Sequence, residues 1–278
     1  MQAENNEAKM TLNDIISKLS EYGVDSPREE ALLILEEAQG VSRAQIMLDT
    51  QKAYTGSRIF EILEKRRERI PLQYILGKWE FMGKEFFVSP ECLIPRPDTE
   101  ILVEKAIEIT KNGEDVADFC TGSGCIGISL ALFCRGINLT LVDISEGALN
   151  IAKKNARSHG VNAEFVLGDI RRYLPSKKFD VITSNPPYIP SSDILKLSEE
   201  VKNEPNIALD GGDDGLDIIR FLLSDGLDYL KDGGRMLIEF GYDQYEKMCA
   251  LLEKNEKIAR YEILFDYGKN PRCAVIYK

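Results

Sequence analysis

The sequence predicts an α/β protein in which a mostly parallel sheet carries helices on both faces, with a small helical region before it. Three observations support this class. After residue 113, short apolar runs alternate with helical segments, as they do in parallel sheets. A glycine-rich turn of the form G-x-G-x-x-G follows the first of these runs and opens a helix. Residues 11–76, by contrast, show helical patterns with little sign of strands.

The composition indicates an acidic, folded protein that we expect in the cytoplasm. Of its 278 residues 44% are hydrophobic, which suffices for a core without disulfides, and its six cysteines lack the paired spacing of a zinc site. Acidic residues exceed basic ones, 46 to 35, which disfavours a dedicated nucleic-acid binder but leaves a local basic groove open. The longest apolar stretch, at 125–134, is too short for a membrane helix, and the polar N-terminus lacks a signal sequence.

The helical region carries recognisable start and stop signals. Residues 26–29 and residues 42–45 both have the form of a capping box, which predicts a helix after each. Another helix is expected from about Ser57, and it must end before Pro71. Its basic run at 65–69 could touch a polyanion, but the interleaved glutamates favour a solvated helix face.

The second region begins with a predicted β-hairpin at 79–88, with Gly83 near its turn. A helix at about 99–110 follows it. Seven strands are then expected, and the close spacing of the last two indicates one antiparallel insertion at the sheet edge. These strands are expected at 116–120, 139–143, 164–167, 179–184, 235–240, 261–267 and 273–277.

The glycine-rich turn at 122–127 predicts a nucleotide-like ligand. Small residues let backbone amides approach the ligand, and Asp143, at the end of the next strand, can accept hydrogen bonds from ribose hydroxyls. The turn fits NAD and S-adenosylmethionine alike, because both carry an adenosine ribose. Asp118 favours the second, since an acid at the end of the first strand could reach the ammonium of a bound amino acid and would repel a pyrophosphate.

The motif Asn185-Pro186-Pro187-Tyr188 directly follows the strand at 179–184, where open α/β sheets bind their ligands. Because prolines donate no N–H, the Pro186 carbonyl is expected to be free, and the Asn185 side-chain oxygen offers a second acceptor. Together they can hold both hydrogens of a substrate –NH2 group. Tyr188 could offer an aromatic face to a planar amide or base. The simpler alternative is a rigid polar turn with a buried tyrosine.

With these motifs the sequence resembles the class I (Rossmann-like) S-adenosylmethionine-dependent methyltransferases that methylate planar –NH2 nitrogens. Within that class it resembles the HemK/PrmC family, the protein-(glutamine-N5) methyltransferases of peptide chain release factors. The N-P-P-Y motif alone is shared with DNA-adenine and RNA methyltransferases. The block I-P-R-P-D-T-E at 94–100 and the helical N-terminus favour the HemK/PrmC family over these other methyltransferases. The resemblance covers nearly the whole chain. Further matching segments lie at 71–77, 79–81, 88–90, 204–205, 208–212 and 214–216.

The resemblance implies a fold, a reaction and partners. It implies an N-terminal helical substrate-recognition domain at 1–78, a β-hairpin linker at 79–98, and a seven-stranded methyltransferase domain at 99–278. The implied reaction moves a methyl group from S-adenosylmethionine to the N5 amide nitrogen of the glutamine in the Gly-Gly-Gln motif of release factors. No direct contact with nucleic acid, membrane or metal is expected, and we expect a monomer.

The candidate site residues fall into three sets. The cofactor-binding candidates are Asp118, Cys120, Thr121, Gly122, Ser123, Gly124, Asp143, Asp169, Ile170 and Asn185. The substrate-binding candidates are Arg96, Asn185, Pro186, Pro187 and Tyr188, and the catalytic candidates among them are Asn185, Pro186 and Tyr188. Two positions depart from the family pattern. Cys120 stands where many members have glycine, and Ile170 stands where some have an aromatic residue.

Three rival functions remain open at this point. A DNA or RNA methyltransferase acting on adenine N6 or guanine N2 would use the same motif on a flipped base, but the acidic charge disfavours it. An NAD-dependent oxidoreductase would explain the turn but not N-P-P-Y. A non-enzymatic cofactor-binding protein would not need two intact acceptors. His159, the only histidine, is expected to be a helix cap or a surface residue, so no general base is predicted.

Overall fold

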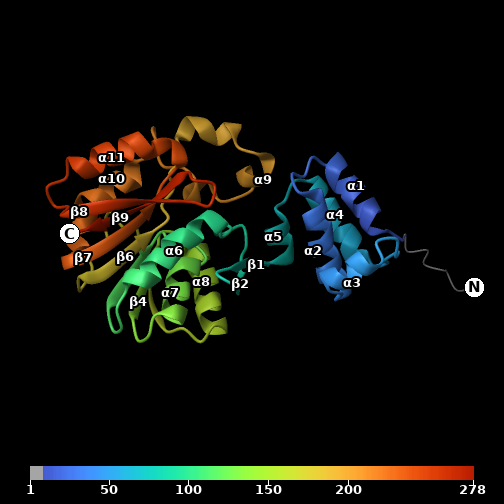
Figure 1. The fold of residues 1–278 in the computed structure, drawn as a ribbon, viewed down its shortest axis with the longest axis horizontal. Coiled ribbons are helices and arrows are strands. Elements are labelled where there is room, and N and C mark those ends of the chain that lie inside the picture. The colour runs from blue at the N-terminus through green and yellow to red at the C-terminus, as the bar shows by residue number, and fades with distance from the viewer. Residues whose placement is uncertain (1–8) are drawn as a thin grey trace, which may run out of the picture. The chain divides into compact units, whose positions relative to one another are not determined.

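The computed structural model describes residues 9–278 and divides into two compact units (Figure 1). The first unit runs to Gly77 and also contains residues 199–203, whereas the second comprises residues 78–198 and 204–278. This division differs from the expected one in two places. The hairpin belongs to the second unit instead of forming a linker, and a short segment of the second half of the sequence belongs to the first unit.

The first unit is helical, as its sequence pattern predicts. Ser42 and Gln45 form the expected capping box, in which each side chain accepts a hydrogen bond from the other residue's backbone N–H. Ser26 makes no such bond, so that predicted box is wrong, and Glu29 pairs with Arg43 instead. The helices are α1 (Leu12–Glu21), α2 (Pro27–Gln39), α3 (Arg43–Leu48), α4 (Ser57–Arg67), α5 (Leu72–Leu76) and α9 (Glu199–Lys202).

Two of the four basic residues at 65–69, Arg66 and Arg69, make ion pairs inside this unit. The Arg66 side chain is 1% exposed, and its guanidinium lies 2.7 Å from a carboxylate oxygen of Glu30 and 2.7 Å from one of Glu200. Arg69 lies 2.7 Å from the other oxygen of Glu200. Buried charges of this kind need their partners, because an unpaired one would cost several kcal/mol. Lys65 and Arg67 are exposed, and Arg67 pairs with Glu64 as expected of a solvated helix face, whereas Arg66 and Arg69 pair with α9.

The second unit contains the predicted seven-stranded sheet, in the order β5-β4-β3-β6-β7-β9-β8. The first five strands in this order are parallel, and β9 is inserted antiparallel between β7 and β8. The predicted class and the antiparallel insertion are thus confirmed. The strands are β3 (Asp115–Phe119), β4 (Asn138–Asp143), β5 (Ala163–Leu167), β6 (Phe179–Ser184), β7 (Leu230–Glu239), β8 (Arg260–Phe265) and β9 (Pro271–Tyr277).

Helices cover both faces of this sheet (Figure 1). Alternate strand residues point to opposite faces, so Val116 joins one buried cluster with α6–α8 and Ala117 joins another with α10 and α11. The order reverses between β3 and β6, which makes their carboxyl ends the point where a ligand is expected. The helices are α6 (Pro97–Ile109), α7 (Cys125–Phe133), α8 (Glu146–Ser158), α10 (Asp217–Leu223) and α11 (Tyr245–Glu253).

The hairpin of β1 (Lys78–Phe81) and β2 (Lys84–Phe87) packs into this unit. Its turn residues Met82 and Gly83 have φ of 52° and 65°, as a two-residue hairpin turn requires. Phe81 and Phe86 are buried in the cluster beneath α6–α8. The Asn155 side chain of α8 accepts a hydrogen bond from the Phe87 N–H at 2.7 Å and donates one to the Ser123 carbonyl at 2.8 Å. One side chain therefore ties the hairpin to the glycine-rich turn.

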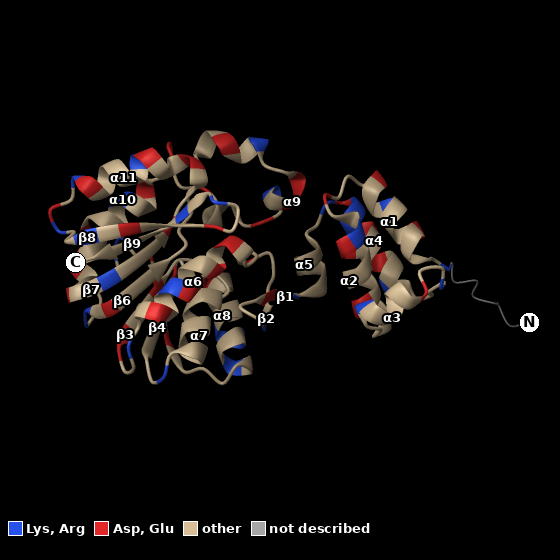
Figure 2. Cartoon of the chain, in the orientation of Figure 1, with Lys and Arg blue, Asp and Glu red and all other residues tan. Residues whose placement is uncertain are grey.

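Charged residues of both signs lie on both units (Figure 2). Acidic and basic residues are mixed over the helices of both units in the view of Figure 2. Across residues 9–278, every helix is too short or too polar to cross a membrane.

Candidate active site

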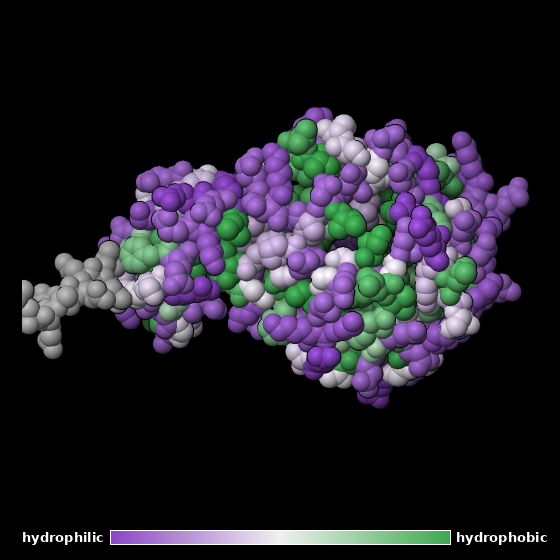
Figure 3. Space-filling view, turned by 180° about the vertical axis from the view of Figure 1, so that it is seen from behind, coloured by the Kyte–Doolittle hydropathy of each residue, from purple (hydrophilic) through white to green (hydrophobic). Residues whose placement is uncertain are grey.

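A pocket of about 380 Å³ lies in the second unit, beyond the carboxyl ends of β3, β4 and β6. Its size falls in the range of small-molecule sites. Ile144 and Ile207, which are about half exposed, give it a partly apolar border, and hydrophobic residues lie along part of a hollow on the face in Figure 3. The predicted residues on its wall are Arg96, Cys120, Thr121, Gly122, Ser123, Asp143, Asp169, Ile170, Asn185 and Pro187.

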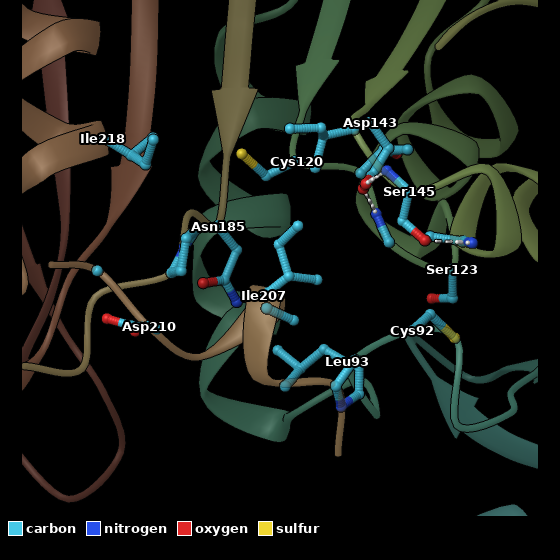
Figure 4. A pocket seen from close by; sticks show the side chains of 18 of the residues that line it. Cys92, Leu93, Cys120, Ser123, Asp143, Ser145, Asn185, Ile207, Asp210 and Ile218 are labelled. Atoms are coloured by element: carbon cyan, nitrogen blue, oxygen red, sulfur yellow. Dashed lines mark hydrogen bonds between the residues drawn. The ribbon is translucent and has the colours of Figure 1, made fainter. Parts of the chain in front are cut away.

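The glycine-rich turn forms one side of the pocket. Its backbone is held by Asp143, whose two carboxylate oxygens accept the N–H groups of Gly122 and Ser145 at 2.8 Å (Figure 4). Burial raises the pKa of Asp143, while these two hydrogen bonds favour its charged form. Each oxygen retains a further lone pair, so the carboxylate can still accept ribose hydroxyls. The buried Ser123 hydroxyl has no hydrogen-bond partner within residues 9–278, as expected of a group that meets a polar ligand.

Cys120 occupies a strained position in this turn. Its φ is 57°, in the left-handed region that glycine adopts without cost, and this agrees with the glycine found here in many members of the resembled family. Its thiol lies on the pocket wall together with those of Cys92 and Cys125. Burial raises the pKa of Cys92 to about 11 and raises those of Cys120 and Cys125 still further. At neutral pH these thiols are therefore protonated and are not nucleophiles.

Asp118 does not line the pocket. Its side chain is fully buried and accepts hydrogen bonds from the hydroxyls of Thr121 and Thr183 at 2.5 and 2.8 Å, and from the Gly127 N–H at 3.3 Å. Burial raises its pKa to about 6. The expectation that Asp118 reaches a ligand's ammonium is therefore corrected. The carboxylate points under the first turn of α7, where it connects β3, β6 and the helix.

Gly124 is also absent from the wall, and its role is packing. A Cβ atom there would lie 2.8 Å from the Ile128 side chain and 3.1 Å from that of Ala152. Gly127, the last glycine of the motif, has the same role, because its Cβ would lie 2.5 Å from Leu141 of β4. These two glycines let α7 approach α8 and the sheet closely. They hold the turn in place without touching the pocket.

Asn185 lies at the end of β6, near Cys120 at the end of β3 (Figure 4). Its side-chain nitrogen donates to the Thr99 hydroxyl at 3.2 Å. The amide oxygen is thereby left as the acceptor that faces away from Thr99. Sequence reasoning did not single out Thr99, although it belongs to the matched block at 94–100.

Pro186 and Tyr188 are not on the pocket wall. Pro186 is buried, and its carbonyl accepts no hydrogen bond from any described residue. The Tyr188 ring packs against the core on the α10–α11 side, and its hydroxyl donates to Glu239 at 3.2 Å. The expectation of an aromatic face toward the substrate is thus corrected. The chain after Pro187 instead pairs with another segment, through a parallel bridge between Ile189 and Asp210.

That segment, residues 209–216, packs closely against the backbone of Pro187 and Tyr188. A Cβ on Gly211 would lie 2.7 Å from the Pro187 carbonyl oxygen, and one on Gly215 would lie 2.2 Å from the Tyr188 carbonyl oxygen. The buried Gln244 amide donates to the same Tyr188 oxygen at 2.8 Å and to the Gly215 oxygen at 3.3 Å. Nothing in the sequence pointed to Gln244, whereas both glycines lie in matched segments.

Arg96 lies on the wall and is held there by an ion pair with Glu204. Glu204 is 5% exposed, and its other oxygen accepts the Ile94 N–H at 3.0 Å. Burial raises the pKa of Glu204, and the Arg96 charge opposes this shift. The carboxylate therefore anchors the matched block at 94–100. The sequence signal was the matched pair Glu204-Pro205, which had no assigned role.

Two remaining titratable groups lie outside the pocket wall. His159 is the C-cap of α8, and its Nε2 lies 2.9 Å from the Glu85 carbonyl oxygen, so the prediction of a capping histidine is confirmed. Glu239, at the end of β7, is 1% exposed. Burial raises the pKa of Glu239 to about 7, although the Thr99 hydroxyl, the Arg272 charge and the Tyr188 hydroxyl all lower it.

The titration of Glu239 predicts how stability depends on pH. Because the folded state holds this proton more tightly than the unfolded chain does, the folded state loses stability as pH rises from about 4.5 through about 7. Glu239→Gln removes this loss. The free energy of unfolding of Glu239→Gln minus that of the wild type should therefore be about 2 kcal/mol larger at about pH 8 than at about pH 5.5.

Urea unfolding at both pH values measures this change. The exposed Glu256→Gln provides the matched control and should give a difference from wild type that does not depend on pH. If the stability difference between Glu239→Gln and the wild type is also independent of pH, Glu239 ionises as readily in the folded protein as in the unfolded chain.

Comparison with known proteins first gives the class. Residues 97–210 match the family model of the methyltransferase small domain, and residues 11–77 match that of the PrmC N-terminal domain. Among solved structures, a methyltransferase from Pyrococcus furiosus has this fold, with a TM-score of 0.54 and 20% identity over 77% of this chain and 98% of its own. The fold and the pocket define a methyltransferase that depends on S-adenosylmethionine.

Curated relatives then give the family. A release factor glutamine methyltransferase from Moorella thermoacetica is 36% identical over 97% of this chain and 98% of its own length. One from Bacillus subtilis is 35% identical over 96% and 99%, and one from Geobacter sulfurreducens is 38% identical over 85% and 84%. The chain belongs to the release factor glutamine methyltransferase family.

Proposed function

We propose that this enzyme transfers a methyl group from S-adenosylmethionine to the N5 amide nitrogen of the glutamine in the Gly-Gly-Gln motif of a peptide chain release factor. The observation that carries the proposal is the orientation of Asn185 on the pocket wall. Its nitrogen is engaged by Thr99, so its oxygen is available to a substrate N–H. Family membership supports the choice of a glutamine amide over a nucleobase amine.

The protein's task follows from the chemistry of an amide nitrogen, whose lone pair is delocalised into the carbonyl. S-adenosylmethionine supplies a methyl group on a sulfonium, which is already a strong electrophile. Asn185 Oδ1 and the Pro186 carbonyl would accept the two N–H groups of the glutamine and orient its nitrogen toward that methyl group. These hydrogen bonds strengthen as positive charge develops on nitrogen, so they stabilise the transition state more than the ground state.

The remaining site residues divide between the two ligands. Asp143 would accept the ribose hydroxyls, and Asp169 and Ile170 would border the adenine. Arg96 and Pro187 would contact the glutamine-bearing loop. No histidine or thiolate on the described wall acts as a base, so the proton is proposed to leave to water after transfer. The first unit would recognise the release factor, and we place this reaction in a cytoplasmic monomer without direct contact with nucleic acid.

Asp143 is expected to account for a measurable part of cofactor affinity. Asp143→Ala should weaken S-adenosylmethionine binding by about 1–3 kcal/mol, because it removes charge-assisted hydrogen bonds to ribose and releases the Gly122 N–H. Isothermal calorimetry measures this change, with the exposed Asp232→Ala as control. Equal affinities for the wild type and Asp143→Ala would remove Asp143 from the cofactor site.

Transfer of labelled methyl tests the proposed substrate. The enzyme is offered a release factor, the same factor with its Gly-Gly-Gln glutamine changed to alanine, and DNA and RNA in separate reactions. Label on the intact factor alone is the expected result. Label on nucleic acid alone would overturn the proposal and assign the Asn185 site to a base amine. Label on both forms of the factor would place the methyl group at another residue.

A further inference from the structure

One side chain on the pocket wall is more strained than the fold requires. Cys120 has a φ of 57°, in the left-handed region where a Cβ atom is costly and glycine is not. The other non-glycine residues with positive φ within residues 9–278 lie in turns outside the pocket wall, and they are Arg69, Met82 and Lys269. Glycine at position 120 would form the same turn without strain. A strained side chain kept at a binding site indicates a use there.

The strand order places Cys120 between the two ends of the proposed ligand site. β3 lies between β4 and β6 in the sheet, and all three strands are parallel, so their carboxyl ends share one edge. Asp143 ends β4, Asn185 follows β6 and Cys120 follows β3. Neighbouring strands lie about 4.8 Å apart, so the ends of β4 and β6 are separated by about 10 Å, with Cys120 in the gap (Figure 4).

The covalent structure of S-adenosylmethionine assigns one part of the cofactor to this gap. Its sulfonium is bonded both to the ribose-bearing carbon chain and to the methyl group that is transferred. With the ribose at Asp143 and the methyl group directed toward the amide held by Asn185, the sulfonium would lie over the end of β3. The alkyl group on the sulfur is therefore the part of the cofactor that would face Cys120.

Cys120 provides the side chain that fills this gap. The Thr121 hydroxyl donates to the buried Asp118 at 2.5 Å, which turns it away from the ligand, and Gly122 has no side chain. The hydroxyl of Ser123, a residue that is 2% exposed, has no hydrogen-bond partner within residues 9–278 and points toward the hollow in Figure 4. This unsatisfied hydroxyl is independent evidence that a polar ligand lies against the same turn.

We propose that Cys120 limits the size of the alkyl group on the cofactor's sulfonium, so that the pocket admits a methyl donor and excludes donors with longer alkyl groups. This inference rests on the proposed function, because the substrate amide at Asn185 defines where the alkyl group points. The physical cause is volume. The Cβ and Sγ atoms of Cys120 occupy space that glycine would leave open, and one excess methylene in a packed pocket is worth about 10- to 200-fold in discrimination.

The Cys120 thiol can lie beside an electrophilic methyl group because it is not ionised. Burial raises the pKa of Cys120 far above the neutral range, and the nearby charge of Asp143 raises it further. A protonated thiol is not a nucleophile, so Cys120 shapes the site without being methylated itself. The Cys120 side chain also packs against the buried cluster of α10 and α11, which restricts its movement.

Calorimetric titration without any release factor tests this inference. The two ligands are S-adenosylmethionine and S-adenosylethionine, which differ by one methylene in the alkyl group. The wild type should bind the ethyl ligand at least about tenfold more weakly, and Cys120→Gly should reduce this ratio of dissociation constants to about threefold or less. Cys120→Ser retains the size and should keep the wild-type ratio. Cys249→Ala, which changes a cysteine of α11 outside the pocket wall, should also keep it.

Three results would overturn the size limit. Equal affinities of the wild type for both ligands would show that the pocket has room for the longer group. An unchanged ratio in Cys120→Gly would assign the limit to another residue. Tighter binding of an N6-methyl analogue of S-adenosylmethionine by Cys120→Gly, without tighter binding of the ethyl ligand, would place Cys120 beside the adenine.

Further measurements separate this result from misfolding and from the proposed substrate. Circular dichroism and urea unfolding check that each variant folds. If Cys120→Gly does not fold, Cys120→Ala, which removes Sγ and keeps Cβ, should give a ratio below that of the wild type. A wild-type enzyme that labels no release factor would overturn the proposed function, whereas the binding ratios would still decide the size limit. An unchanged ratio beside normal labelling would overturn the size limit alone.

Discussion

Replacing Asn185 with alanine is expected to lower kcat by about 100-fold or more, the scale seen when one preorganised transition-state partner is removed. Asn185 Oδ1 is the acceptor that the structure places on the pocket wall, with the amide held by Thr99 at 3.2 Å. The proposed hydrogen bond from the substrate –NH2 to this oxygen would strengthen as the nitrogen becomes positive, so its loss should affect kcat more than KM. Steady-state transfer of labelled methyl to a release factor measures both constants.

A matched control and a binding measurement complete this test. Asn162 is an exposed asparagine away from the pocket, and Asn162→Ala should keep the wild-type kcat. Calorimetry should show that Asn185→Ala still binds S-adenosylmethionine, which excludes a collapsed site as the cause. Turnover by Asn185→Ala within a few-fold of wild type would exclude Asn185 from the chemistry.

Gly215→Ala is expected to have the largest effect on stability, about 2–5 kcal/mol. Gly215 has a φ of 77°, which costs a non-glycine residue about 1–2 kcal/mol. In addition, its Cβ would lie 2.2 Å from the Tyr188 carbonyl oxygen and 2.5 Å from Gln244 Nε2. Overpacking of this kind costs about 1–3 kcal/mol more. The segment 209–216 would have to move away from the Asn185–Tyr188 motif, so activity should fall as well.

Gly160→Ala separates the two costs. Gly160 has a φ of 66°, but a Cβ there would meet no atom within 4 Å. It should therefore show only the conformational cost and keep full activity. Urea unfolding of both variants gives the difference between them. Equal losses of stability at the two positions would show that the 209–216 segment does not press against Tyr188.

The sequence by itself determined what depends on neighbouring residues. Alternating apolar runs and helical segments predicted the sheet, its antiparallel insertion and the helices on both faces, since these follow from local periodicity. The glycine-rich turn and N-P-P-Y each follow a predicted strand directly, and parallel strands share one carboxyl edge. Cys120, Asp143 and Asn185 were therefore expected at one pocket, and they lie on its wall. The family could also be named from these motifs and the block at 94–100.

The tertiary structure decided what depends on residues far apart in the sequence. Thr99 meets Asn185 across 86 positions, Arg96 meets Glu204 across 108, and Tyr188 meets Glu239 across 51. Local propensity has no access to such pairs, because they form only when packed elements bring the side chains together.

The orientation of individual side chains has the same origin. Asp118 lies at the expected strand end, yet its carboxylate points beneath α7 and not into the pocket. Tyr188 belongs to the motif, yet its ring packs against the core, and the next residue, Ile189, pairs with Asp210. A motif fixes the order of residues along the chain. The packing of helices and neighbouring segments decides which of them face the ligand and which hold the others in place.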